Sequence, residues 1–278
     1  MHSQTEHSPH HPRTFMARCA LVVVLAASCA SALAHDTWLA AEQRTVQARS
    51  PLRLGMTSGE HFPVPGSSID RDRIAHAGCQ QGPAKFPLEP GRRGAKELHL
   101  EAKPPAQGAA TCWVRLKPRT LDLTPDLVAL YLEEIDATAD IRKSWADMPA
   151  PKRWNETYTK NAKVIVPAGS SPPAIAGAAP TLTLELQPEA DLSVGKLAGP
   201  LAVRVLRDGL PLAGLSVALV SEAGGTPQRQ RSDAQGRVVF ATPAPGRWML
   251  SGTALRSLSA KEGTWESQFT TLVFELLP

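Results

Sequence analysis

The stretch that decides the fold reads Leu201-Ala202-Val203-Arg204-Val205-Leu206, then Arg207-Asp208-Gly209, then Leu215-Ser216-Val217-Ala218-Leu219-Val220. Two short apolar runs on either side of a glycine-containing turn are typical of β-strands. The same rhythm continues through the turn at 233–236 to further runs at 238–240, 246–250 and 269–274. Together with a strand-like run at 181–186, this spacing predicts a β-sandwich over residues 181–278. We expect Trp248 to be buried as an anchor of its core.

Working outward toward the N-terminus, residues 38–123 show shorter alternating runs that glycine and proline interrupt. Period-two alternation bounded by turn residues predicts half-buried β-strands. We assign strands to the runs 45–48, 51–54, 97–101 and 111–116, and a further strand to 164–166. These strands predict an N-terminal β-sandwich domain over residues 35–180.

One helix interrupts the strand pattern. Thr124-Pro125-Asp126 supplies an N-cap, a proline at the start of the helix and an early acid, and apolar residues follow at helical spacing from Leu127 to Ile135. We expect this helix near 125–136. Residues 167–180 are dominated by Ala, Gly, Ser and Pro, so they form a loop or a connection between domains. The predicted fold class is mostly β, with two β-sandwich domains and one inserted helix.

The first 34 residues have the features of a signal peptide. Arg13 and Arg18 precede the apolar run 21–27, and Ala32-Leu33-Ala34 forms a cleavage site of the A-x-A type. We therefore expect export to the periplasm and a processed chain that starts at His35. The alternative is a lipoprotein acylated at Cys29, which would leave His35 internal, although Ala26 stands where a larger aliphatic residue is usual.

The composition of residues 35–278 limits the kinds of partner that the chain can bind. Lys plus Arg number 30 and Asp plus Glu 26, and the leader contains only Arg13, Arg18 and Glu6 of them, so the balance after cleavage stays nearly even. Scattered charges of both signs argue against nucleic acid as a partner. No later run is apolar for long enough to span a membrane. Cys79 and Cys112 predict a disulfide in an exported protein, and two buried thiols are the alternative.

The processed N-terminus suggests metal binding. An N-terminal histidine offers a metal ion two nitrogens, the α-amine and ring Nδ1, and the amine has an ordinary pKa of about 7.7–8.0, so a metal displaces its proton near neutral pH. We expect His35 to bind a divalent transition metal ion, nickel, cobalt or copper, because these ions accept compact nitrogen-rich sites. His61 is the expected additional ligand and Glu60 an oxygen donor; an exposed loop is the alternative for His61. We expect His76 and His99 to be exposed.

Enzyme motifs are scarce. The sequence has no G-x-S-x-G elbow, H-E-x-x-H helix, P-loop or Rossmann glycine pattern. The adjacent acids Glu133 and Glu134 do not face each other on a helix, so they favour a solvated surface. We therefore expect a protein that is not an enzyme. Two alternatives remain: a structural or adhesive protein without metal, and a copper oxidase built on the same N-terminal histidine.

Several motifs carry a resemblance to a known family. These are His35-Asp36-Thr37-Trp38-Leu39, Leu54-Gly55-Met56-Thr57-Ser58-Gly59 with Phe62-Pro63, Leu123-Thr124-Pro125-Asp126-Leu127-Val128, Tyr158-Thr159-Lys160 and Trp265-Glu266-Ser267. The chain is similar to an uncharacterised bacterial family labelled as the periplasmic component of nickel or cobalt uptake systems. The second half, with the turns 209–214 and 232–237, also resembles prealbumin-type and immunoglobulin-like sandwiches of exported proteins.

The resemblance implies a periplasmic metal-binding carrier or accessory protein, with His35 as the first site residue and a membrane transporter component as a partner. Two departures from the family pattern stand out. Asn161 follows Tyr158-Thr159-Lys160 where relatives often have a histidine or an aromatic residue, and Ala254-Leu255-Arg256 stands where they often have a polar or histidine-containing strand. A ligand from either place would be missing in this chain.

Overall fold

The computed structural model describes residue 2 and residues 35–46, 50–168, 182–259 and 262–278. The chain divides into two units, Met1–Ser31 and Ala32–Pro278. The predicted signal peptide, with Cys29 and the cleavage site, lies outside the described residues. All of the described strands and helices belong to the second unit.

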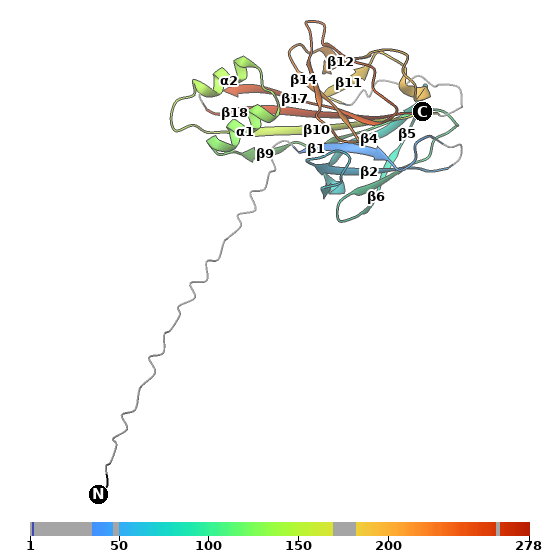
Figure 1. Ribbon diagram of the computed structural model, residues 1–278, viewed down its shortest axis with the longest axis horizontal. Coiled ribbons are helices and arrows are strands. Elements are labelled where there is room, and N and C mark those ends of the chain that lie inside the picture. The colour runs from blue at the N-terminus through green and yellow to red at the C-terminus, as the bar shows by residue number, and fades with distance from the viewer. Residues whose placement is uncertain (1, 3–34, 47–49, 169–181, 260–261) are drawn as a thin grey trace. The chain divides into compact units, whose positions relative to one another are not determined.

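A nine-stranded sheet, here called the central sheet, runs through the second unit (Figure 1). Its strand order is β15-β14-β17-β18-β10-β8-β4-β5, and β9 pairs with β10 beside β8. The strands are β15 (Gln228–Arg231), β14 (Ser216–Ser221), β17 (Gly246–Ser259), β18 (Thr264–Leu276), β10 (Asn155–Val166), β8 (Ala110–Leu116), β4 (Ile74–Gln81), β5 (Ala84–Phe86) and β9 (Arg119–Asp122).

The two halves of the sequence meet inside this sheet. β10 pairs in parallel with β18 along a register that runs from Asn155 opposite Thr264 to Ile165 opposite Phe274. β17 and β8 lie on the outer sides of this pair, both antiparallel to their neighbours. The domain boundary expected between residues 180 and 181 lies in 169–181, outside the described residues. β10, which precedes this boundary, is hydrogen-bonded to β18, which follows it.

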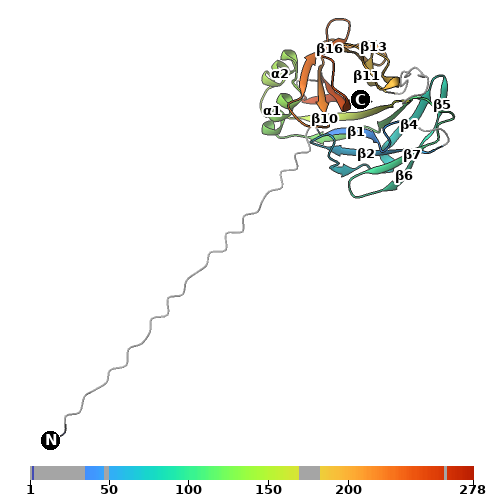
Figure 2. The same cartoon turned by 45° about the vertical axis from the view of Figure 1, so that its right-hand side comes forward.

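Two smaller sheets cover opposite faces of the central sheet. The N-terminal sheet contains β1 (Asp36–Ala41), β2 (Leu52–Gly59), β3 (Ser67–Ser68), β6 (Leu88–Arg93) and β7 (Leu98–Ala102); the C-terminal sheet contains β11 (Leu184–Pro188), β12 (Leu201–Arg207), β13 (Leu210–Pro211) and β16 (Arg237–Phe240). Figures 1 and 2 agree in placing β10 between β1 and β2 on one side and β11 on the other.

Alternation along β10 and β18 explains this layering. Val164 and Val166 belong to the core shared with Trp38 and the N-terminal sheet, whereas Ile165 belongs to the core of the C-terminal sheet. In β18, Val273 faces the first core, and Leu272 and Phe274 face the second. Successive strand residues point to opposite faces, so a strand that is apolar at every position serves two cores at once.

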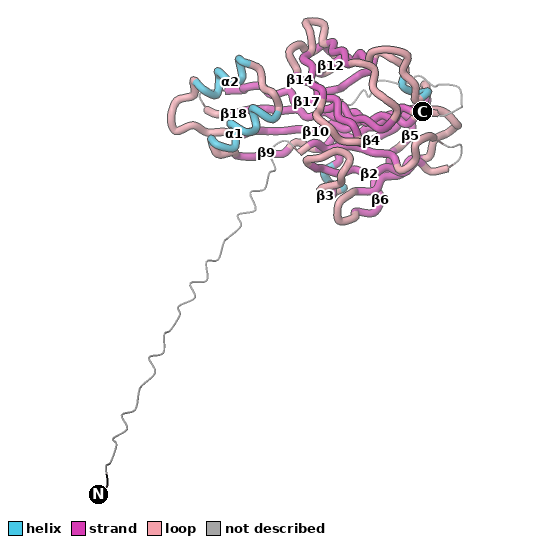
Figure 3. Tube along the Cα trace, in the orientation of Figure 1, coloured by secondary structure: helices cyan, strands magenta, loops and turns pink. Residues whose placement is uncertain are grey.

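Two α-helices cover the remaining part of the face that carries the N-terminal sheet (Figure 3). α1 (Pro125–Glu134) confirms the helix predicted near 125–136. Thr124 lies at its N-cap, but its side chain makes no capping hydrogen bond. The sequence pattern does not predict α2 (Ala139–Ala146), because this helix has no fully buried residue and its apolar side chains are few. The 3-10 helices are η1 (Arg71–Arg73) and η2 (Leu192–Val194).

The helices pack on an aromatic core. Tyr131 from α1 lies against Trp154, and Trp154 stacks on Trp265 with a centroid separation of 4.3 Å and an interplanar angle of 14°. Phe269 of β18 completes the contact with Tyr131. These side chains are almost fully buried, so aromatic area anchors the helices to the central sheet.

Most predicted strands are present, with shifted bounds, and two expectations were wrong. Thr45 lies in a bend and Val46 in irregular structure rather than in a strand, and the rest of the run 45–48 falls outside the described residues. Trp248 is only half-buried: it packs against the core of the C-terminal sheet, and its Nε1 donates to the carbonyl of Ala244, 2.9 Å away. Trp38, Trp154 and Trp265 are the most deeply buried tryptophans of the described residues.

The predicted disulfide is confirmed. Cys79 in β4 and Cys112 in β8 face each other across the pair of strands and are bonded. Both are fully buried in the core beneath the N-terminal sheet. The bond therefore joins two neighbouring strands within the central sheet rather than one sheet to another.

Candidate functional site

Strand pairing places His35 beside Glu60. β1 and β2 are antiparallel, with Asp36 opposite Gly59 and Thr37 opposite Ser58. Continued by one residue, this register sets His35 opposite Glu60. Nε2 of His35 lies 2.9 Å from Oε1 of Glu60. Two of the three residues that the sequence suggested for a metal site are therefore in direct contact.

Two glycines allow the close chain approach that fixes this corner. A Cβ on Gly59 would lie 2.8 Å from the ring of Trp38, and a Cβ on Gly66 would lie 2.5 Å from the carbonyl oxygen of Ser58. Both separations are shorter than atoms tolerate, so glycine is required where β2 passes β1 and β3. The corner that carries Glu60 is held by packing on both sides.

The contact between His35 and Glu60 has an electrostatic signature. The hydrogen bond from His35, and then its charge, hold the pKa of the Glu60 carboxyl below its ordinary value. The carboxylate therefore accepts a hydrogen from Nε2 of His35 at neutral pH. This contact occupies Nε2 and leaves Nδ1 of His35 without a hydrogen-bond partner among the residues that the structure describes.

Lys160 binds the backbone of His35. Its Nζ donates to the carbonyl oxygen of His35 at 2.6 Å. The ammonium also lies over two rings, 5.2 Å from the centroid of Phe269 and 5.9 Å from that of Tyr158. Burial lowers the pKa of Lys160 to about 8. A lysine from a strand distant in the sequence thus fixes the backbone at the start of β1.

A cleft of about 220 Å³ opens beside His35. It lies between the N-terminal sheet and strands β8, β9 and β10 of the central sheet, and we call it the His35 cleft. Charged or polar side chains dominate its lining: His35, Ser58, Arg73, Arg119, Tyr158 and Lys160. Sequence reasoning assigned no role to the last four. The available signal was the spacing of Tyr158 and Lys160, which two-residue alternation places on one face of a strand.

Asp36 points to the other side of β1. It lines a smaller cavity of about 60 Å³ together with Glu134 and Arg229. Burial is the main cause that raises the pKa of the Asp36 carboxyl to about 6, against a hydrogen bond from Ser251 and the charge of Lys160. Burial also raises the pKa of Glu134. The start of β1 therefore lies between a basic cleft and an acidic cavity.

The other described histidines take no part in the contact between His35 and Glu60, although His61 follows Glu60 directly and its charge acts on the Glu60 carboxyl. His61 is exposed, and its carbonyl oxygen accepts from the backbone N–H of Val64 in a turn. His76 is exposed on β4. His99 on β7 is half-buried, with Nδ1 4.0 Å from Glu42. Among the described residues, no group of three or more His, Cys, Asp and Glu side chains is arranged to hold a metal ion.

Residues at both departures from the family pattern have partners within the protein: Asn161 in the interior, and Arg256 on the surface. Nδ2 of Asn161 donates to the carbonyl of Phe269, and its Oδ1 accepts from the backbone N–H of Thr183. Asn161 is fully buried and lies on the face of β10 opposite Lys160. Arg256 pairs with Glu266 across β17 and β18. These positions are structural in this chain.

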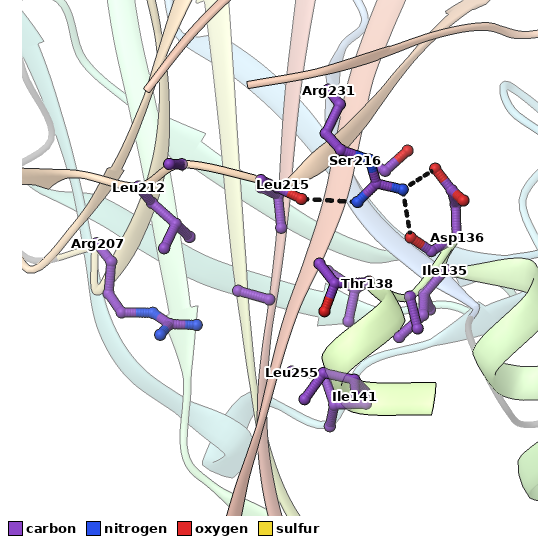
Figure 4. Close-up of a pocket in the computed structure, with 15 residues that line it drawn as sticks. Ile135, Asp136, Thr138, Ile141, Arg207, Leu212, Leu215, Ser216, Arg231 and Leu255 are labelled. Carbon is purple, nitrogen blue, oxygen red and sulfur yellow. Dashed lines mark hydrogen bonds and ion pairs between the residues drawn. The ribbon is translucent and has the colours of Figure 1, made fainter. Parts of the chain in front are cut away.

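A second pocket, of about 100 Å³, lies between the turn joining α1 to α2 and the strands β14 and β17 (Figure 4). Its walls are largely apolar, with Ile135, Ile141 and Leu255 among them. Arg231 lies at its margin, where it donates to Asp136 at 2.5 Å and to the carbonyl of Gly214 at 2.7 Å. Its charge is thus satisfied within the protein.

The fold and this corner define a class: a mostly β protein with a central sheet covered on both faces and a polar cleft where its first strand begins. Residues 32–254 match the family model described as a domain of unknown function, DUF4198, and the chain belongs to that family. No curated protein matches the chain. None of the described helices is long and apolar enough to cross a membrane.

Several solved chains match, and one of them is weakly similar. It is native alpha-2-macroglobulin from Escherichia coli spanning domains MG0-NIE-MG1, at 12% identity over 86% of this chain and 95% of that chain. The TM-score is 0.22. A likeness at this level carries no argument about fold or function.

Proposed function

We propose that the chain, once cut after Ala34, binds one divalent transition metal ion through the α-amine and Nδ1 of His35. The observation that supports the proposal is the 2.9 Å contact between Nε2 of His35 and Glu60. Histidines that bind metals usually donate their other ring N–H to a carboxylate, which fixes the ring and its tautomer. Glu60 stands at the nitrogen that the chelate does not use.

The contact refines the role of Glu60. In the proposed site it orients the imidazole instead of supplying a metal oxygen. His61 is the candidate for an additional ligand from the same loop, and the other positions around the ion go to water or to a small ligand. Both the amine and the imidazole bind metal only when deprotonated, so affinity falls as the pH falls from about 8 toward 5.

The proposed setting is the periplasm, where the chain would act as a carrier or accessory protein for nickel or cobalt uptake with a membrane transporter component as its partner. This part of the proposal rests on the resemblance of the sequence motifs. It requires export and cleavage before His35. The intact mass of protein recovered from the periplasm should therefore equal that of residues 35–278, and an acylated chain starting at Cys29 would remove the amine ligand.

Titration calorimetry with nickel, cobalt, copper and zinc tests the site itself. The samples are the chain that starts at His35, a chain with one extra alanine before His35, Glu60→Gln and His61→Ala. The extra residue turns the amine into an amide without removing a side chain, so we expect the extended chain to lose at least about tenfold in affinity. Glu60→Gln should lose about 10–100-fold, because the carboxylate no longer orients the ring.

His76→Ala is the matched control, since it removes an exposed histidine from β4. We expect its affinity to equal that of the native chain. Equal metal affinity of the extended and native chains would overturn the proposal, because the terminal amine would then play no part. Absence of binding in every sample would favour a structural protein without metal.

A further inference from the structure

We infer that the His35 cleft binds a small anion that carries carboxylate or phosphate groups. The inference does not depend on metal binding by His35. It rests on the charges, the hydrogen-bonding groups and the size of the cleft.

Three cationic side chains line the cleft: Arg73, Arg119 and Lys160. Within the described ranges none of the three forms a salt bridge, although carboxyls that do not line the cleft act on two of them, Asp36 on Lys160 and Asp72 on Arg73. Asp70 also lines the cleft, but its carboxylate pairs with Arg93 at 3.0 Å. The cleft therefore carries an excess of positive charge, which a bound anion would offset.

The cations come from separate elements. Arg73 ends η1, Arg119 begins β9, and Lys160 lies in β10, where Arg119 is opposite Tyr158. Burial, and then the charge of Arg119, lower the pKa of Arg73, as expected for cations that face one another across a small space. The three positive charges repel one another and raise the free energy of the folded protein, unless a bound anion or counterion in the cleft offsets them.

Hydrogen-bonding groups of the lining are also incompletely used. Nε of Arg73 and Oγ of Ser68 are buried and have no hydrogen-bond partner among the described residues. Both residues line the cleft, as do Tyr158, whose hydroxyl interacts with Arg73, and Ser67, whose hydroxyl donates to the carbonyl of Ser58. Buried polar atoms normally have partners, and a bound ion or water is a common partner where the protein supplies none. Guanidinium and hydroxyl donors suit carboxylate and phosphate oxygens.

The volume of the His35 cleft limits the size of the ligand that it can hold. Pockets for drug-sized molecules usually measure about 300–1,000 Å³, whereas this cleft measures about 220 Å³. It fits an anion with one to three charged groups and excludes a polymer from its interior. Because His35 lines the same cleft, such an anion would lie next to the N-terminal residue of the processed chain.

Titration calorimetry in metal-free buffer tests the inference with three probes: citrate, succinate and inorganic phosphate. We expect at least one probe to bind, and its affinity to fall as sodium chloride increases. The comparison of citrate and succinate with phosphate separates a carboxylate site from a phosphate site. If none of the three binds at up to about 10 mM, a concentration that saturates a site with a dissociation constant of about 1 mM, the inference is wrong.

Arg119→Gln is the decisive variant, because Arg119 is exposed and its removal leaves the core intact. We expect it to weaken anion binding at least about tenfold, since it removes a charge-assisted contact, and Arg119→Lys to restore part of it. Arg53→Gln is the matched control: Arg53 is also an exposed strand arginine, on β2, but it does not line the cleft. Equal losses in both glutamine variants would indicate non-specific attraction and overturn the site.

The chain with an extra alanine before His35 separates this inference from the proposed function. It lacks the free amine of His35 but keeps all three cations of the cleft. We expect it to bind the anion like the native chain even if it no longer binds metal. Loss of anion binding in this chain would contradict a site formed by the cations.

Discussion

Glu156 is the most deeply buried carboxyl of the aromatic core beneath the helices. It accepts hydrogen bonds from Tyr131 at 3.1 Å, from Trp154 at 2.8 Å and from Ser267. Burial is the largest cause that acts on it, and the pKa of Glu156 is raised despite these three donors. The motif Trp265-Glu266-Ser267 therefore supports the core: Trp265 stacks on Trp154, and Ser267 donates to Glu156.

We expect the free energy of unfolding of Glu156→Gln, measured relative to that of the native chain, to increase as the pH rises. A carboxyl whose pKa is higher in the folded state contributes stability that is complete below its unfolded pKa and is lost as the pH rises through its folded pKa. Glutamine keeps the size and an acceptor oxygen without ionising. Urea unfolding at pH 4.5 and pH 8 measures the effect, with Glu89→Gln on exposed β6 as the control. If the difference in free energy of unfolding between Glu156→Gln and the native chain is the same at both pH values, the prediction is wrong.

A second buried charge links two sheets. Nζ of Lys163 in β10 lies 2.5 Å from Oε1 of Glu185 in β11, and both side chains are almost fully buried. Lys163→Met would leave the Glu185 charge in the interior without this partner. We expect a loss of about 3–5 kcal/mol in the free energy of unfolding. The double variant Lys163→Met/Glu185→Met should recover much of the loss. Denaturant unfolding of the native chain, the two single variants and the double variant measures the coupling free energy between Lys163 and Glu185.

At the scale of elements, the disulfide joins β4 to β8 and closes a loop with a sequence separation of 33. On the chain-entropy estimate, such a loop contributes about 3–4 kcal/mol. We therefore expect reduction to lower the free energy of unfolding of the native protein by about this amount. The same reductant should leave Cys79→Ala/Cys112→Ala unchanged. Native protein that is reduced by mass yet equally stable would refute the estimate.

Local patterns predict most elements but not what they contact. The capping sequence at Thr124-Pro125-Asp126 specifies α1, and the runs 201–206 and 215–220 specify β12 and β14 nearly to the residue. The first half of β10 resembles a polar stretch in the sequence, because Glu156, Tyr158 and Lys160 are polar or amphipathic. Their burial comes from helices and strands distant in sequence, which a local pattern does not contain.

The candidate site shows the same division. The chemistry of the loop predicts His35 and Glu60 as neighbours, and the register of β1 with β2 places them in contact. The sequence does not mark Arg73 and Arg119 as site residues, because they come from separate elements and belong to no compact motif, and Lys160 stands out only through the motif Tyr158-Thr159-Lys160. A cluster built by tertiary packing leaves no spacing rule in the sequence.

At the scale of the whole unit, the two predicted sandwiches share their middle layer. The central sheet provides one face to the N-terminal sheet and the helices, and the other to the C-terminal sheet. Each of β10 and β18 therefore contributes side chains to cores on both faces, and successive residues belong to different cores. This explains why the apolar positions of β18 are buried almost without interruption from Phe269 to Leu276.

The parallel pairing of β10 with β18 also has a consequence for folding. β18 follows the other described strands in the sequence, and β10 and β17 both pair with it, so the middle of the central sheet is incomplete until β18 is in place. Until then β10 and β17 each keep an unpaired edge, and closing so long a loop is slow. We therefore expect the central sheet to close later in folding than a sheet built from local hairpins, because its middle pair joins strands that are distant in the sequence.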